Sequence, residues 1–213
     1  SNHPKVYGAD EVEVIPKLLE ENFGSDLNKI INFDKNNLKN IGDAYIKKMS
    51  SISNNSERTT DKLPSNFNWI GFIKIILPKS KIIHCYRNSK DNCLSIYKNY
   101  FSGSGIKFAY DIEEIVEFYN LYQDLMNHWN NLLPNFIFNI KYENLILNTE
   151  IEIKKLLKFC DLSWSKNCLN FHENKKPIKT ASDIQARYKI YNTSIDSWKN
   201  YDKYLSKYFN KLI

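Results

Sequence analysis

The sequence of 213 residues predicts an α/β fold in three layers, with a central parallel sheet flanked by helices. Segments with strand-like and helix-like patterns alternate along the chain, and the connections between them are short. Residues 82–86 form a nearly continuous apolar run, which is typical of a parallel strand covered on both faces. Neither an internal repeat nor a linker is present, so residues 1–213 are expected to form one domain.

The first third of the chain predicts two strands and three helices. A short strand is expected to end at Val6 and Tyr7, and a helix to begin near Val14, where Pro16 is tolerated in the first turn. Residues 58–61 are interpreted as a strand end. Two further helices are indicated by apolar residues at helical spacing, at positions 38, 41, 45 and 49 and then from 67 to 77, ahead of Pro78.

The rest of the chain continues the alternation of predicted strands and helices. After the strand at 82–87, Ser89 is the expected cap of a helix in which Leu94, Tyr97 and Phe101 recur at helical spacing. A long helix with one apolar face is predicted over 111–133. It is followed by a strand over 136–142, a helix starting at Thr149 and a helical stretch over 197–212.

The composition is that of a soluble domain with a sizeable core, since 42% of the residues are apolar and 14% are aromatic. No apolar run approaches the roughly 20 residues that a membrane span needs, and the start does not resemble a signal peptide. The cysteines at 85, 93, 160 and 168 show no CxxC pairing. They are interpreted as core thiols, which favours a cytoplasmic location.

The net charge of +6 is compatible with a nucleic acid, a membrane surface or an anionic small molecule as partner. The lysines are scattered rather than gathered in a basic arm, so we expect little nucleic-acid binding at physiological salt. The four histidines, at 3, 84, 128 and 172, lack metal-ligand spacing, and neither zinc nor iron is expected.

Arg87 and Ser95 form a candidate phosphate clamp. Arg87 would lie at the carboxyl end of a parallel strand and Ser95 about two turns into the next helix, at the edge where open α/β sheets bind ligands. An arginine offers a two-pronged donor to phosphate, and a serine adds one hydroxyl. The alternative is that Arg87 is a solvated charge at a strand end and Ser95 an ordinary helix serine.

Six segments in order resemble the sulfotransferases, in particular the bacterial group often found behind tetratricopeptide repeats, which is related to the tyrosylprotein sulfotransferases. The resemblance implies a P-loop NTPase-like fold that binds 3′-phosphoadenosine-5′-phosphosulfate and transfers its sulfuryl group to a hydroxyl or amine, without a metal. The segments are HPKVYGADE at 3–11, TTDKLPSNF at 59–67, IIHCYRNSKDNCLS at 82–95, FAYDIEEIVEFYNLYQDLMNHW at 108–129, KYENLI at 141–146 and TASDIQARYKIYNTSIDSWKNY at 180–201.

The resemblance also implies roles for single residues. Arg87 and Ser95 match the pair that holds the 3′-phosphate of the nucleotide. Glu11 matches a carboxylate proposed as general base, and Lys62 matches a lysine near the bridging oxygen of the leaving nucleotide. The alternatives are that Glu11 is an acidic residue ahead of a helix and that Lys62 belongs to an ordinary turn.

Two further positions are implied nucleotide contacts. Tyr142 lies at a strand end where the relatives contact the nucleotide, although it could equally be a half-buried aromatic. Lys199 belongs to a Trp-Lys-Asn segment similar to one that follows a glycine-rich loop in cytosolic sulfotransferases, but the glycines are absent here. Weaker candidates are Ser194, Ser197 and Arg187, and a loop containing Gly103 and Gly105 is interpreted as a lip over the acceptor site.

One departure from the family pattern concerns the start of the chain. Family members carry a strand and a Ser-Gly-Thr-Thr-like loop ahead of the segment that here begins at His3, so the first strand and the phosphate loop are expected to be missing. We expect the chain to be a fragment of a longer protein; the alternative is a natural truncation with impaired or lost donor binding. The alternative function is that of a noncatalytic nucleotide-binding or interaction module of the same fold. The acceptor (protein tyrosine, glycan or small molecule) and the oligomeric state are left open.

Overall fold

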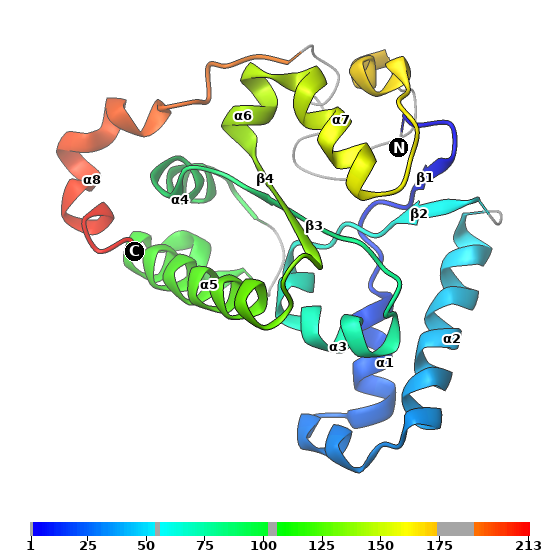
Figure 1. Ribbon diagram of the computed structural model, residues 1–213. Coiled ribbons are helices and arrows are strands. Elements are labelled where there is room, and N and C mark those ends of the chain that lie inside the picture. The colour runs from blue at the N-terminus through cyan, green and yellow to red at the C-terminus, as the bar shows by residue number, and fades with distance from the viewer. Residues whose placement is uncertain (1, 54–55, 102–105, 174–189) are drawn as a thin grey trace. The chain divides into compact units, whose positions relative to one another are not determined.

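The computed structural model describes residues 2–53, 56–101, 106–173 and 190–213 (Figure 1). The described chain divides into two compact units. The first holds the residues up to Ser80 together with 164–173, and the second holds 81–163 together with 190–213. Each unit is described by itself, and the expectation of a single domain stays a prediction.

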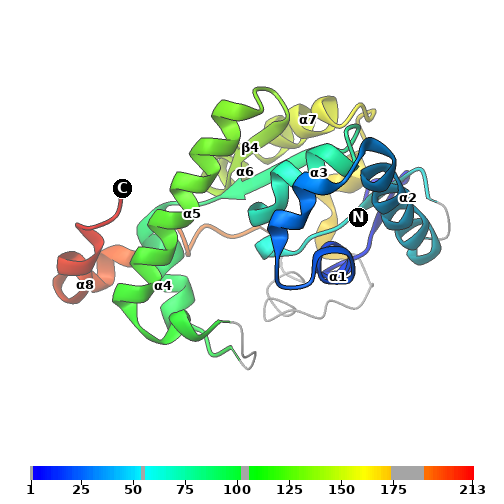
Figure 2. The same ribbon diagram turned by 90° about the horizontal axis from the view of Figure 1, so that it is seen from below.

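The first unit is built on two parallel strands and three packed helices. Strand β1 pairs with β2 in the register Val6 to Arg58. Helix α2 packs against both α1 and α3 (Figure 2). The predicted helix start at Val14 is confirmed, and a strand lies within the segment 58–61 that was interpreted as a strand end. The elements span β1 Val6–Gly8, α1 Val14–Phe23, α2 Lys35–Ile52, β2 Arg58–Thr60 and α3 Ile70–Ile76.

Helix α2 has a well-defined start and a close contact with α3. Asp34 accepts a hydrogen bond from the Asn37 amide at 2.8 Å, and the Asn37 side chain accepts one from the Asp34 amide at 3.1 Å, so a capping box closes the N-terminus. At Gly42, a β-carbon would lie 2.1 Å from the backbone oxygen of Ile76. The two helices therefore touch backbone to backbone at this glycine.

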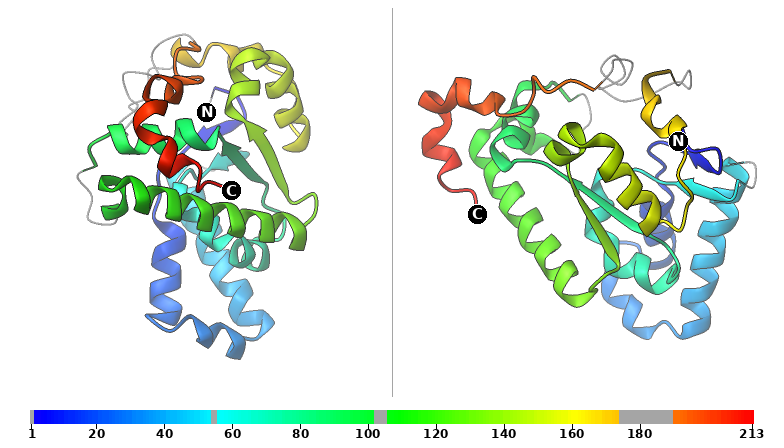
Figure 3. Two further views of the ribbon diagram at one scale, coloured as in Figure 1. Left: turned by 90° about the vertical axis from the view of Figure 1, so that its left-hand side faces the viewer. Right: turned by 45° about the horizontal axis from the view of Figure 1, so that its top comes forward.

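The second unit is built on another parallel pair, in which β3 and β4 align Ile82 with Ile137. Helix α5 packs against α4 and α8, and Figure 3 shows α8 beside α5. The elements span β3 Ile82–Tyr86, α4 Ser89–Lys98, α5 Ile112–Leu132, β4 Ile137–Lys141, α6 Tyr142–Leu147, α7 Thr149–Phe159 and α8 Asp202–Phe209. Short 3₁₀ helices span Leu27–Asn32, Pro64–Trp69, Lys107–Tyr110, Lys166–Leu169, Phe171–Glu173 and Ser197–Tyr201.

Three local predictions about β3 and α4 are wrong. The strand was expected to be covered on both faces, yet Ile83 and Cys85 are exposed, because burial alternates along β3 and the described part of its sheet has two strands. The helix cap is Asn88 rather than Ser89, since the Asn88 side chain accepts the Asp91 amide at 3.2 Å. The helix ends at Lys98, before Phe101.

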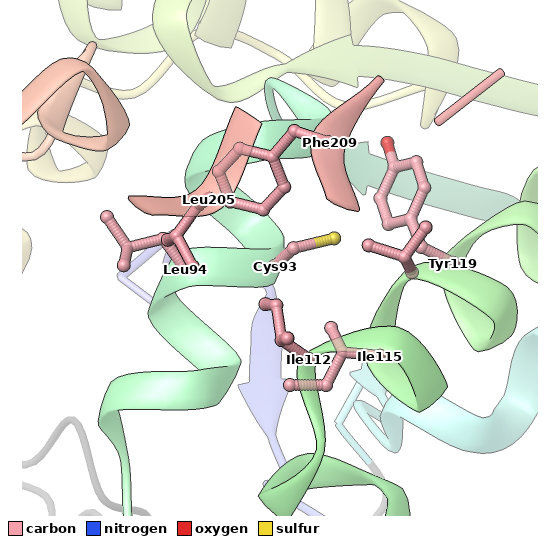
Figure 4. Packing of buried hydrophobic residues seen from close by; sticks show 8 residues of the cluster. Cys93, Leu94, Ile112, Ile115, Tyr119, Leu205 and Phe209 are labelled. Carbon is pink, nitrogen blue, oxygen red and sulfur yellow. The ribbon is translucent and has the colours of Figure 1, made fainter. Parts of the chain in front are cut away.

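A buried cluster joins the C-terminal helix to the rest of the second unit (Figure 4). It combines residues of α4, α5 and α8, namely Cys93, Leu94, Ile112, Ile115, Val116, Tyr119, Leu205 and Phe209. Cys93 is fully buried, as expected for a core thiol, whereas the exposed Cys85 corrects that expectation for its own position. The cluster fixes α8 beside α4, and so fixes one end of the segment that precedes α8.

Candidate active site

Glu11 and Lys62 meet at the carboxyl ends of β1 and β2. The parallel ladder continues past the strands, because the Lys62 amide donates to the Asp10 carbonyl at 3.0 Å. The ammonium of Lys62 forms an ion pair with Oε1 of Glu11. Both side chains stay accessible, at 40% exposure for Glu11 and 56% for Lys62. The two residues predicted to be catalytic are thus neighbours, although their roles stay predictions.

The turn that carries Lys62 is held by the buried face of α2. Tyr45 donates its hydroxyl to the Asp61 carboxylate at 2.9 Å, and Asn66 donates to the same carboxylate at 3.4 Å. Burial raises the pKa of Asp61, and these two hydrogen bonds partly oppose that effect. Burial, together with the Asp61 charge, also raises the pKa of Tyr45.

Sequence reasoning missed this support. The signal was Tyr45 itself, which occupies the otherwise apolar stripe at positions 38, 41, 45 and 49 of α2. A half-buried tyrosine hydroxyl on such a stripe needs a hydrogen-bond partner, and Asp61 supplies it.

An open cavity of about 460 Å³ borders Glu11 in the first unit. Its volume lies within the range of small-molecule sites. The lining combines apolar side chains with charged ones and includes Val12, Ile52, Leu63, Glu11, Lys17 and Lys48.

Arg87 organises the candidate site of the second unit. It follows directly after β3, and its Nη2 donates to the carbonyl oxygen of Ser194. The guanidinium carbon lies 5.3 Å from the ring centroid of Tyr142, whose hydroxyl is 3.2 Å from Oγ of Ser194. Two segments that are distant in sequence, those of Tyr142 and Ser194, therefore converge on Arg87, whose side chain is 19% exposed.

Asp91, which sequence reasoning also missed, lies at the centre of the contacts around this arginine. Its carboxylate is fully buried in the first turn of α4 and accepts three hydrogen bonds from the segment 196–198. Arg87 Nη2 lies 3.9 Å from the same carboxylate. The available signal was a carboxylate three positions before the apolar Leu94, and so on the same face of the helix.

Glu143 is a further missed residue. Its Oε1 accepts the amide of Asn88 at 2.9 Å, so the first turn of α6 holds the loop between β3 and α4. This contact fixes the backbone next to Arg87.

The remaining candidates occupy varied positions. Ser95 is half-buried on α4. Lys199 is 60% exposed in the 3₁₀ helix Ser197–Tyr201, and its ammonium pairs with Asp196 at 2.7 Å. Ser197 points its hydroxyl at Asp91. The weaker candidate at 187 and the glycine lip at 103 and 105 lie outside the described residues.

The described residues contain neither a candidate membrane span nor a candidate metal-binding cluster. No helix there is both long and apolar enough to cross a membrane. Likewise, within the described ranges no group of three or more His, Cys, Asp or Glu side chains could hold a metal ion.

The paired parallel strands and their surrounding helices make this an α/β protein and are consistent with a P-loop-like fold. In agreement, the chain matches the structure of a sulfotransferase domain from the curacin biosynthetic pathway with a TM-score of 0.52 at 17% identity, over 91% of this chain and 80% of that one. The sequence model of the sulfotransferase family matches residues 1–166. The chain therefore belongs to the sulfotransferase family.

A curated relative extends the comparison. An uncharacterized protein of Aquifex aeolicus (strain VF5) is 33% identical over 217 aligned positions, which cover 96% of this chain. The chain spans 28% of the length of that relative.

Proposed function

We propose that this chain transfers a sulfuryl group from 3′-phosphoadenosine-5′-phosphosulfate to a hydroxyl or amine acceptor. Membership of the sulfotransferase family supports the reaction class. The observation that carries the choice of donor is the position of Arg87, a largely buried cation at the carboxyl end of a parallel strand.

The residues around Arg87 fit an anionic nucleotide. Its Nε atom is buried and makes no hydrogen bond to any described residue, so one donor of the guanidinium is left unsatisfied, which favours an anionic partner at this position. In the proposal, Arg87 and Ser95 hold the 3′-phosphate, while Tyr142 and Lys199 make further nucleotide contacts. The bound donor supplies an activated sulfuryl group.

The first unit supplies the acceptor chemistry in this proposal. Glu11 takes the proton of the acceptor hydroxyl as the acceptor oxygen bonds to sulfur and the bond from sulfur to the nucleotide oxygen breaks. Lys62 stabilises the negative charge on that leaving oxygen. Their mutual ion pair does not prevent these roles, because an exposed pair contributes only about 0–1 kcal/mol.

The cavity beside Glu11 supports an acceptor that carries an apolar body. Val12, Ile52 and Leu63 offer it an apolar wall, while Glu11 lies at the same cavity. A phenolic hydroxyl, on a small molecule or on a tyrosine of a protein, combines such a body with an acidic proton; a glycan hydroxyl fits the lining less well.

The cellular location and the origin of the protein belong to the same proposal. The four cysteines, all of them described, form no disulfide, which supports a cytoplasmic location. The relative from Aquifex aeolicus supports a bacterial origin.

The proposal is tested by incubating the 213-residue chain with the donor and a panel of acceptors: a phenol, a tyrosine peptide and a sugar. Chromatography measures the release of adenosine 3′,5′-bisphosphate. We expect release that depends on the acceptor and is unaffected by a chelator. A folded chain that binds the nucleotide but releases none with any acceptor would instead support the noncatalytic module of the same fold.

A further inference from the structure

We propose that Asp91 is a positioning residue that holds the segment Ser194–Trp198 beside Arg87. The anchoring follows from contacts within the second unit. Its effect on nucleotide affinity rests in addition on the proposed function.

The contacts of Asp91 are those of an anchor. Oδ2 accepts the amide of Asp196 at 2.8 Å, and Oδ1 accepts the amide of Trp198 at 3.0 Å and the hydroxyl of Ser197 at 2.9 Å. Hydrogen bonds to an ionised acceptor are stronger than those between neutral groups. A fully buried carboxylate is costly unless such donors and a nearby cation compensate it, and Arg87 at 3.9 Å is that cation.

The anchored segment is supported differently at its two ends. Residues 190–196 form neither helix nor strand, whereas the 3₁₀ helix Ser197–Tyr201 leads into α8 and Trp198 packs against the buried cluster. Asp196 itself has φ of 61°, a left-handed conformation that costs a residue with a side chain some free energy. The amide of this residue is one of those that Asp91 accepts, so the carboxylate stabilises the turn where the backbone is least favourable.

Holding this segment in place also affects Arg87, because the segment contains Ser194, the hydrogen-bond partner of Arg87. Ser194 lies two residues before Asp196; its carbonyl accepts from Arg87 and its hydroxyl contacts Tyr142. Displacing 194–198 would remove both contacts at once. A competing explanation is that Asp91 only stabilises the N-terminus of α4 through the helix dipole. If that were its only role, replacing Asp91 would lower the stability of the whole unit and would not affect residues 196–198 more than the others.

Amide hydrogen exchange, followed by NMR residue by residue, separates these explanations. Asp91→Asn keeps an oxygen for the two donors on Oδ1 but turns an NH₂ group toward the Asp196 amide. We expect exchange at Asp196 to accelerate by about tenfold or more while Trp198 stays protected. Asp91→Ala should release both amides. Exchange within the β3–β4 pair should stay as in the wild type, as should every amide in the control Asp124→Asn, an exposed site on α5.

Two results would contradict the anchoring role of Asp91. One is unchanged protection from exchange at Asp196 in Asp91→Asn together with unchanged protection at both amides in Asp91→Ala. The other is an equal acceleration of amide exchange throughout the second unit. Ser197→Ala covers the case in which the Asp91 variants do not fold, since it removes one donor and leaves the carboxylate in place. It should accelerate exchange at Trp198 severalfold, and wild-type exchange there would count against the anchor.

The effect on the ligand is measured as the affinity for adenosine 3′,5′-bisphosphate. Asp91→Asn should weaken it by about tenfold, as expected for the loss of one hydrogen bond to a charged group, and Asp124→Asn should not. Unchanged affinity with a released segment would refute the positioning role. If the wild type itself fails to bind, the proposed function fails and the effect on affinity with it, while hydrogen exchange still decides the anchor.

Discussion

Glu11 and Lys62 are separated by 51 positions in the sequence, and parallel pairing of β1 with β2 brings their side chains into an ion pair. Since both are well exposed, the pair contributes little to folding. Replacing either should therefore change chemistry more than stability.

Replacing Glu11 tests whether the residue acts on catalysis without contributing to stability. Glu11→Gln should lower kcat by about 10²–10⁴-fold, as for a lost general base, and leave the free energy of unfolding within about 0.5 kcal/mol of the wild type. Nucleotide release and urea unfolding measure the two quantities. Glu20→Gln, at an exposed position of α1, is the matched control. Equal activity of the two variants would remove Glu11 from the mechanism.

Asp61 gives a prediction about pH. Because burial raises its pKa, the folded state binds the proton more tightly than the unfolded state does. The stability contributed by this proton is complete below the unfolded pKa, about 3.9, and is lost as the pH rises through the higher folded value. Asp61→Asn cannot titrate and still offers an oxygen to Tyr45. Urea unfolding from about pH 4 to 7 should show the stability of the wild type relative to Asp61→Asn falling as the pH rises; a constant or rising difference would contradict this account of Asp61.

At the scale of elements, the backbones of α2 and α3 approach closely where the two helices cross at Gly42. Gly42→Ala would place a methyl group against the backbone of Ile76, which can move only if one helix shifts. We expect a loss of about 1–3 kcal/mol in unfolding free energy, typical of overpacking, measured by urea denaturation. Asn40→Ala, exposed on the same helix, should not destabilise. Equal stability of the two variants would mean that the helices separate easily.

Most elements could be predicted because periodic apolar residues decide them. The helix beginning at Val14, the long helix after Asp111 and the helix beginning at Thr149 all follow the pattern. The expectation that β3 is covered on both faces failed because burial alternates along the strand. The other errors lie at helix boundaries, where single hydrogen bonds decide. Asn88 rather than Ser89 caps α4, and the helix ends before Phe101 although Phe101 continues the helical spacing of apolar residues.

The site was less predictable for a different reason. Arg87 could be singled out because a polar residue ended an apolar run. Its contact with Ser194 joins positions 107 apart and depends on a segment without regular structure, so no local pattern predicts it. Asp91 was missed for a related reason. A carboxylate on a buried helix face indicates that it has hydrogen-bond donors or a cation as partners, but the sequence does not show which residues these are.

At the scale of the whole molecule, the candidate residues fall into two groups. Glu11 and Lys62 belong to the first compact unit, whereas Arg87, Ser95, Tyr142 and Lys199 belong to the second. The proposal therefore gives acceptor and leaving-group chemistry to one unit and nucleotide anchoring to the other. The family model spans residues 1–166 and so covers every one of these candidate residues except Lys199.

The central claim, that Arg87 anchors a nucleotide 3′-phosphate, is tested most directly by calorimetric titration of the chain with adenosine 3′,5′-bisphosphate. Adenosine 5′-monophosphate and the variant Arg87→Ala serve as controls. We expect the bisphosphate to bind at least about tenfold more tightly than the monophosphate, and Arg87→Ala to abolish that preference. Equal binding of both nucleotides, or a preference that survives in Arg87→Ala, would contradict the claim.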